Sequence, residues 1–111
     1  MTTSDIPILV PPAELTAATD TAFEALAAPH LEASAPGLVI DLSAVSLVTS
    51  AGLGRLVHLG RALHERGGKL ALAGGSRTVT RLLRTVGLDA VMPHFPTAEG
   101  AVQYIRGQPR V

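Results

Sequence analysis

The sequence predicts an α/β fold, with a mixed or mainly parallel sheet of about four strands and helices packed largely on one face. Short apolar runs bounded by turn residues alternate with longer amphipathic segments, as in an α/β layer structure. Hydrophobic residues make up 47% of the chain and charged residues 16%, a composition that can bury a core. At 111 residues we expect a single domain over 1–111, with its core at about 6–106.

The N-terminal part predicts a strand, a helix and a second strand. The apolar run from Ile6 to Val10 precedes two prolines, as in a strand at a sheet edge. The alanine-rich stretch from Ala13 to about Ala28 has high helix propensity, and Pro29 is expected to end it. The run from Leu38 to Leu42 predicts a buried central strand. The expected inner face of the helix comprises Leu15, Ala18, Ala22 and Leu26.

A second helix is predicted from about Gly52 to Arg66, because apolar residues recur there at the spacing of one helix face. Gly67 stands where a helix-ending glycine is expected. The apolar stripe comprises Leu53, Leu56, Gly60 and Leu63, flanked by Val57 and Leu59. The opposite arc comprises Arg55, His58, Arg61, Glu65 and Arg66.

The C-terminal part predicts two more strands and two more helices. Lys69 to Ala73 reads as a strand, and Ser76 is placed to cap a helix that runs to Val86. Ala90 to Met92 is a candidate last strand, and Ala98 to Ile105 a last helix. We expect Val79, Leu82, Leu83 and Val86 to face inward and Arg77, Arg81 and Arg84 to form a solvated outer face.

Charge is distributed unevenly along the chain, although the formal net charge is zero. Every charged residue before Arg55 is acidic, whereas all nine basic residues lie from Arg55 onward. Two interpretations stay open: the halves pair with each other in the fold, or they make a bipolar surface that orients a partner. Zero net charge and an aromatic content of 3% argue against a nucleic-acid partner.

The sequence has no cysteine, no signal-peptide pattern and no apolar run long enough to cross a membrane. We therefore expect a cytoplasmic protein without direct membrane insertion. No pattern indicates the oligomeric state.

The stretch from Asp41 to Gly54 reads Asp-Leu-Ser-Ala-Val-Ser-Leu-Val-Thr-Ser-Ala-Gly-Leu-Gly. It resembles the signature of the STAS domain family, in which a strand ending in Asp-Leu-Ser leads to Asp-Ser-Ser-Gly-Leu-Gly at a helix start. Residues 65–70 and 82–89 resemble later family segments, so the match covers roughly 38–102. By this resemblance the chain is identified as a STAS domain of the anti-sigma factor antagonist type.

The resemblance implies a binding module whose partner is an anti-sigma factor with serine/threonine kinase activity. In the resembling proteins that partner phosphorylates the serine directly before Gly-Leu, which lowers the affinity. Here that position is Ala51, and Thr49 replaces the loop aspartate. Ser50 is then the best candidate acceptor and Thr49 the next. Two alternatives stay open: Ser50 merely caps the helix, or the module binds without a switch.

The candidate partner-binding residues are those of the loop and the following helical turns. A hydroxyl before Ala-Gly-Leu also resembles the STAS subunits of lipid-transporting ABC systems, in which the loop docks on the ATPase. The alternative function is therefore an accessory subunit whose partner is an ABC transporter ATPase. The candidate contact residues are Thr49, Ser50, Ala51, Gly52, Leu53, Arg55 and His58.

Catalytic and metal sites are not indicated. His58 and His64 are six residues apart on one helix and so do not share a face. No nucleophile–base pair is apparent, and we predict a protein that is not an enzyme, with no metal and no cofactor. The segment 74–76, Gly-Gly-Ser, could hold a phosphate at a helix start, but a plain turn with a cap explains it equally well.

Overall fold

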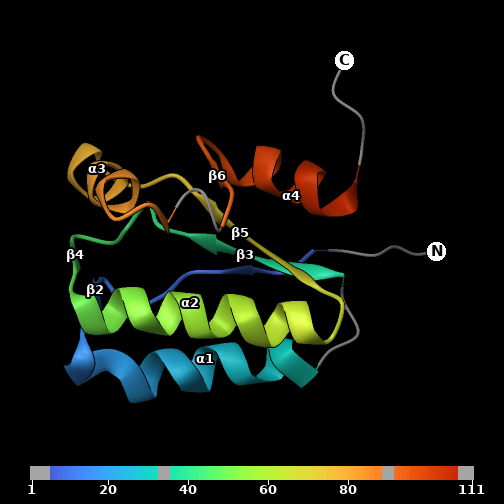
Figure 1. Cartoon of the computed structure of the whole chain (residues 1–111), viewed down its shortest axis with the longest axis horizontal. Coiled ribbons are helices and arrows are strands. Elements are labelled where there is room, and N and C mark those ends of the chain that lie inside the picture. Colours follow the sequence, from blue (N-terminus) through green and yellow to red (C-terminus); the bar gives the residue numbers. More distant parts are fainter. Residues whose placement is uncertain (1–5, 33–35, 89–91, 108–111) are drawn as a thin grey trace.

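The computed structural model describes residues 6–32, 36–88 and 92–107, in which a parallel sheet lies between two helical layers (Figure 1). The four strands of this sheet are, in spatial order, β1 (Ile8–Leu9), β3 (Gly37–Asp41), β5 (Lys69–Ala73) and β6 (His94–Phe95). Every neighbouring pair is parallel. The predicted α/β fold with about four strands is therefore confirmed, with β1 at the expected edge.

Four α-helices occur among the described residues: α1 (Asp20–Glu32), α2 (Ser50–Glu65), α3 (Arg77–Thr85) and α4 (Ala98–Arg106). Two short strands, β2 (Glu14–Leu15) and β4 (Leu47–Val48), form a separate parallel pair. A short 3-10 helix, η1 (Ala17–Thr19), leads into α1. No helix in the described ranges is long and apolar enough to cross a membrane.

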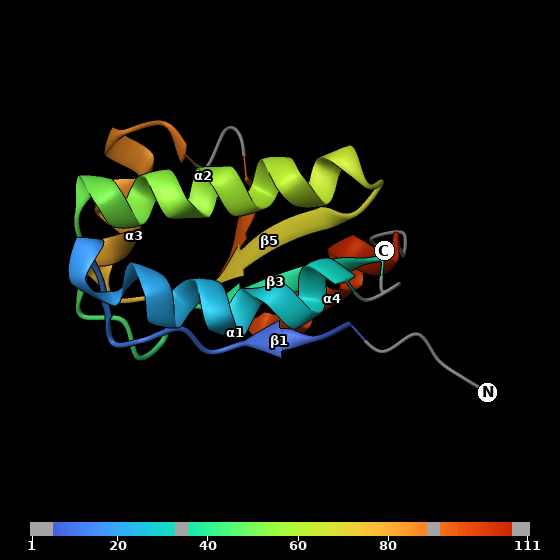
Figure 2. The same ribbon diagram turned by 90° about the horizontal axis from the view of Figure 1, so that it is seen from below.

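The helices cover both faces of the sheet, three on one side and one on the other. Alternate strand residues point to opposite faces, so Leu38 and Ile40 pack with α1, α2 and α3, whereas Val39 packs with α4. Figure 2 shows α1 and α2 side by side on their face. Helices cover both faces of β3, so its central residues 38–40 are apolar without alternation. The predicted buried central strand is confirmed.

The first predicted helix is wrong at both ends. Residues 13–19 are not α-helical, because Glu14 and Leu15 pair with β4. Pro29 does not end the helix but lies inside α1. The buried face is also different: Phe23 and Ala27 are buried. Of the four residues predicted to face inward, Leu15 is buried but lies in β2, whereas Ala18, Ala22 and Leu26 are exposed.

The later elements agree better with the sequence. α2, β5 and α4 lie within two residues of their predicted bounds, and Ser76 caps α3 by accepting a hydrogen bond from the Val79 N–H at 3.1 Å. Val86, predicted to face inward, is 50% exposed because α3 ends just before it. The predicted last strand lies mostly outside the described residues, and β6 follows Met92 instead of including it.

Candidate functional site

The loop between β3 and α2 is fastened to the rest of the molecule before the helix begins. The Leu42 N–H donates to the Ala73 carbonyl at 2.8 Å, and the Ser43 N–H donates to the Asp41 side chain at 2.9 Å. Farther along, β4 pairs with β2, and the Thr49 N–H donates to the carbonyl of Leu15 at 2.9 Å. The start of α2 is therefore held in place by the short β2–β4 sheet.

Thr49 is the N-cap of α2. Its backbone is extended, with φ −101° and ψ 176°, and its hydroxyl accepts a long hydrogen bond of 3.5 Å from the Gly52 N–H. The same hydroxyl donates to the Leu15 carbonyl at 3.3 Å. The interpretation of Ser50 as the cap was wrong, because the pairing with β2 places Thr49 at the capping position.

Ser50 is the first residue of α2, and its side chain is exposed. Within the part of the chain that the structure describes, its hydroxyl has no hydrogen-bond partner. Ala51 beside it is also exposed. A helix start carries unpaired N–H groups and partial positive charge, which favour an anion. Ser50 thus presents a free hydroxyl where added negative charge is tolerated electrostatically.

Gly52 and Leu53, which follow the exposed Ser50 and Ala51, face the interior of the protein. Gly52 is buried, and a Cβ added to it would lie 2.1 Å from the Leu15 carbonyl oxygen, so no side chain fits there. Leu53 is partly buried and packs against the larger core cluster. These two residues position the loop and offer little surface of their own.

Arg55 joins α2 to α1 through a bidentate contact with Asp20. Its Nε lies 2.5 Å from Asp20 Oδ1 and its Nη2 lies 2.7 Å from Oδ2, with Glu24 Oε2 at 4.0 Å from Nη1. The hydrogen bond from Arg55 lowers the pKa of Asp20 below its ordinary value of 3.8. Arg55 therefore has its main partner within the chain.

A shallow depression of about 520 Å³ brings three of the predicted contact residues together: Ala51, Arg55 and His58. The structure adds the carboxylates Asp20 and Glu24 from α1, which the sequence analysis missed. Their i, i+4 spacing placed them on one face of the predicted helix, but nothing in the sequence indicated that this face lies beside α2. The remaining lining residues are Ala17 and Gly54.

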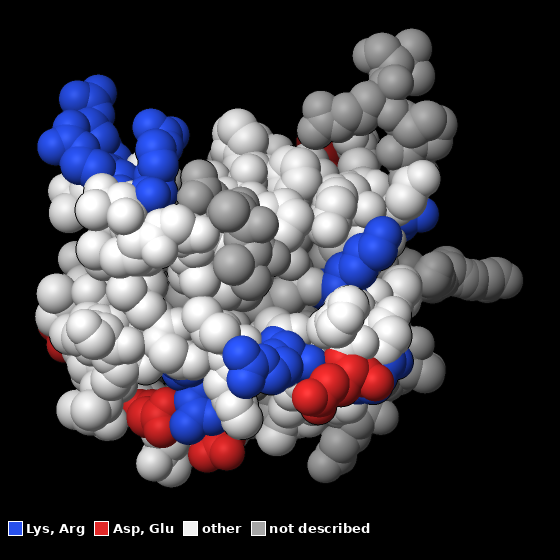
Figure 3. Space-filling model, viewed as in Figure 1, with Lys and Arg blue, Asp and Glu red and all other residues white. Residues whose placement is uncertain are grey.

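The acidic N-terminal half and the basic C-terminal half of the chain form ion pairs at Arg55. The arginines of α3 differ from Arg55 in this respect. Arg77, Arg81 and Arg84 are exposed and have no ion-pair partner among the residues that the structure describes. In Figure 3 basic side chains stand out over α3, and acidic and basic side chains lie together over the start of α1 and α2. The two halves therefore pair with each other at Arg55, while α3 keeps an exposed basic surface; that such a surface orients a partner stays a prediction.

Metal-ligating side chains do not gather in groups of three or more over residues 6–32, 36–88 and 92–107. His58 and His64, both on α2, are exposed. His94 bonds through Nε2 to the Gly74 carbonyl oxygen at 2.6 Å. His58 and His64 are thus surface residues, and His94 is a hydrogen-bonding residue.

Comparison with known proteins places the chain in a family. The sequence model of the STAS domain family matches residues 1–101, so the chain belongs to this family. An anti-sigma factor antagonist from Mycobacterium paratuberculosis is similar to it, at 31% sequence identity and a TM-score of 0.74, over 84% of this chain and 79% of that chain. No curated protein sequence matches.

Two more distant structures are similar in fold alone. The anti-sigma factor antagonist SpoIIAA in its unphosphorylated form is 21% identical, over 99% of this chain and 96% of that chain, with a TM-score of 0.75. The STAS domain of the SulP transporter from Vibrio cholerae is 18% identical, over 97% of this chain and 86% of that chain, with the same TM-score. The fold is thus shared by antagonists and transporter domains.

Proposed function

We propose that the chain is a single-domain, anti-sigma factor antagonist-like module that binds an anti-sigma factor with serine/threonine kinase activity. The observation that carries this proposal is the exposed, unpartnered Ser50 hydroxyl at the first residue of α2, beside exposed Ala51. The 31% identity to an anti-sigma factor antagonist supports the same function. In this function the protein acts in the bacterial cytoplasm as a regulator of transcription and performs no catalysis itself.

The contact surface consists of the loop and one side of the first turns of α2. Ser50, Ala51 and His58 are the exposed members that touch the partner. Thr49, Gly52 and Leu53 hold the loop in shape, because they cap the helix, approach β2 and pack on the core. Arg55 contributes as part of its ion pair with Asp20, which forms one wall of the adjacent depression.

Phosphorylation of Ser50 would switch this surface. The partner kinase transfers the γ-phosphoryl group of ATP to Ser50 Oγ, and ADP and the hydroxyl proton are released. The phosphate adds about −1.5 to −2 charges at pH 7. The helix start tolerates this charge, whereas a partner surface docked on the neutral hydroxyl would be repelled or left with desolvated charge. Thr49 is the weaker acceptor, because its hydroxyl already bonds to Leu15 and Gly52.

Affinity capture with the tagged full chain tests the proposal, from lysate that includes detergent-solubilised membranes. Mass spectrometry identifies the recovered partners and any phosphorylated residue. Recovery of an anti-sigma factor of the kinase type is expected, with phosphate on Ser50 where the switch operates. If Ser50 and Thr49 are both unmodified, the module binds constitutively. Recovery of an ABC transporter ATPase with its permease would contradict the proposal and favour the transport alternative.

A further inference from the structure

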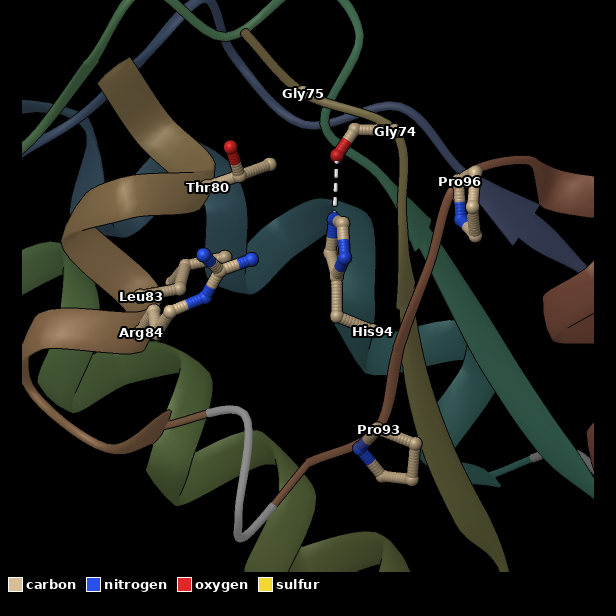
Figure 4. A pocket seen from close by; sticks show the side chains of 8 residues that line it. All are labelled: Gly74, Gly75, Thr80, Leu83, Arg84, Pro93, His94 and Pro96. Carbon is tan, nitrogen blue, oxygen red and sulfur yellow. Dashed lines mark hydrogen bonds between the residues drawn. The ribbon is translucent and has the colours of Figure 1, made fainter. Parts of the chain in front are cut away.

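A cleft of about 690 Å³ lies between α3 and β6, lined by none of the loop residues discussed above (Figure 4). Small-molecule sites in proteins have volumes of about 300–1,000 Å³, so this cleft is large enough for one. Its lining residues are Gly74, Gly75, Thr80, Leu83, Arg84, Pro93, His94 and Pro96.

The topology of the sheet explains why the cleft forms there. β5 and β6 are neighbouring parallel strands. The chain leaves β5 into α3, which packs on the face that α1 and α2 cover, and it leaves β6 into α4 on the opposite face. Where neighbouring parallel strands send their connections to opposite faces, a crevice opens at their carboxyl ends, and ligands of open α/β sheets bind in such crevices.

A histidine stands on the wall of this cleft. His94 pairs in register with Leu72, so its side chain lies on the same face of the sheet as α3. A carbonyl oxygen only accepts hydrogen bonds, so His94 Nε2 is the donor in the 2.6 Å bond to the Gly74 oxygen. This bond fixes the ring against the wall, as Figure 4 shows.

The remaining lining groups suit an anion with an apolar part. No Asp or Glu is among the described residues that line the cleft, and Arg84 on α3 supplies a guanidinium without an ion-pair partner in the described part of the chain. The Thr80 hydroxyl donates to the carbonyls of Ser76 and Arg77, at 3.0 and 3.1 Å, so its proton is engaged and Arg84 is the main donor for the anion. Leu83 and the two prolines form the apolar wall.

We propose that this cleft binds a small phosphate monoester, with its phosphate on Arg84 and its apolar part against Leu83. Arg84 can make two parallel hydrogen bonds to phosphate oxygens, the geometry that arginine favours with this group. The site goes beyond the partner-binding proposal and does not depend on it.

Titration of the isotope-labelled full chain with phenyl phosphate, followed by NMR, tests this site. Saturable shifts are expected for Gly75, Thr80, Arg84 and His94, and benzyl alcohol at the same concentration should produce none. Arg84→Gln should weaken binding of phenyl phosphate by at least about tenfold, because the charge and its two hydrogen bonds to the phosphate are lost. Arg81→Gln is the matched control, because Arg81 is exposed on the same helix but does not line the cleft. It should change the affinity by less than about twofold.

Three results would overturn the proposal. Shifts that stay linear with concentration would show that no site exists. An equal loss of affinity in Arg81→Gln and Arg84→Gln would show diffuse attraction to the basic face of α3. Binding of benzoate as tightly as phenyl phosphate would rule out a phosphate monoester as the preferred ligand class. Both side chains are exposed, so we expect both variants to fold. Well-dispersed spectra would exclude unfolding as the cause of any loss of affinity.

Discussion

At Gly52 the start of α2 meets β2 so closely that only glycine fits. A Cβ there would lie 2.1 Å from the Leu15 oxygen, and its other nearest neighbours are also atoms of Leu15. Two residues later, a Cβ on Gly54 would meet nothing within 4 Å. The two glycines lie on the same turns of one helix, yet they have opposite structural roles.

Alanine substitutions at these two glycines should therefore change stability in opposite directions. Gly52→Ala should destabilise the fold by about 1–3 kcal/mol, the usual cost of forcing a methyl group into a packed region. Gly54→Ala should stabilise it by up to about 1 kcal/mol, because alanine is the better helix former. Urea unfolding of both variants measures the difference. Equal stability of the two would refute the close approach between α2 and β2.

The capping residue shows where sequence patterns stop being informative. Thr49 and Ser50 are both good caps, and both precede the periodic apolar positions of α2. The choice between them depends on the two hydrogen bonds between Thr49 and Leu15, which is 34 residues away. A contact so distant in sequence leaves no local signal. The sequence therefore indicated the segment of the candidate site, but not which of its two hydroxyls caps the helix and which is free.

Among the secondary-structure elements, α2, β5 and α4 could be predicted because their signals are local. Their apolar spacing, caps and flanking glycines all indicate the same element. Residues 13–19 have high helix propensity, but Glu14 and Leu15 form a strand because they pair with β4. Two-residue strands have no recognisable period, so this pair could not be found in the sequence. Tertiary pairing overrode local preference.

The ion pair between α1 and α2 should make stability depend on pH. Because Arg55 lowers the pKa of Asp20 below 3.8, the pair stabilises the fold above pH 3.8, and this contribution is lost as pH falls through the lowered pKa. Asp20→Asn should be less stable than the wild type at neutral pH, and the difference should vanish in acid. Chemical unfolding at several pH values measures this.

Glu24→Gln is the control for that experiment. Its carboxylate lies 4.0 Å from Arg55 and is 64% exposed, so its removal should matter less than that of Asp20. A difference between Asp20→Asn and the wild type that stays constant from neutral pH to strong acid would indicate lost packing and contradict the role of the charge.

At the scale of the molecule, β3 and β5 are the longest of the described strands and should be the best protected from hydrogen exchange. β3 and β5 pair over five residues each, and their central residues are buried on both faces. We expect the slowest amide hydrogen exchange at 38–40 and 70–72, because such amides open only on global unfolding. The β2–β4 pair, two residues per strand with exposed Glu14 and Leu47, should exchange faster. Equal protection of both sheets, measured by NMR, would contradict this hierarchy.

The central claim is that the start of α2 is the partner surface and that charge at Ser50 controls it. The most direct test is calorimetric titration of the purified anti-sigma factor partner with the wild type, Ser50→Glu and Gln103→Glu. Ser50→Glu adds a negative charge at a helix start that tolerates it, while Gln103→Glu adds the same charge to an exposed position on α4. We predict that Ser50→Glu weakens binding at least about tenfold and Gln103→Glu by less than about twofold. Equal affinity of the wild type and Ser50→Glu, or equal losses in both variants, would contradict the claim.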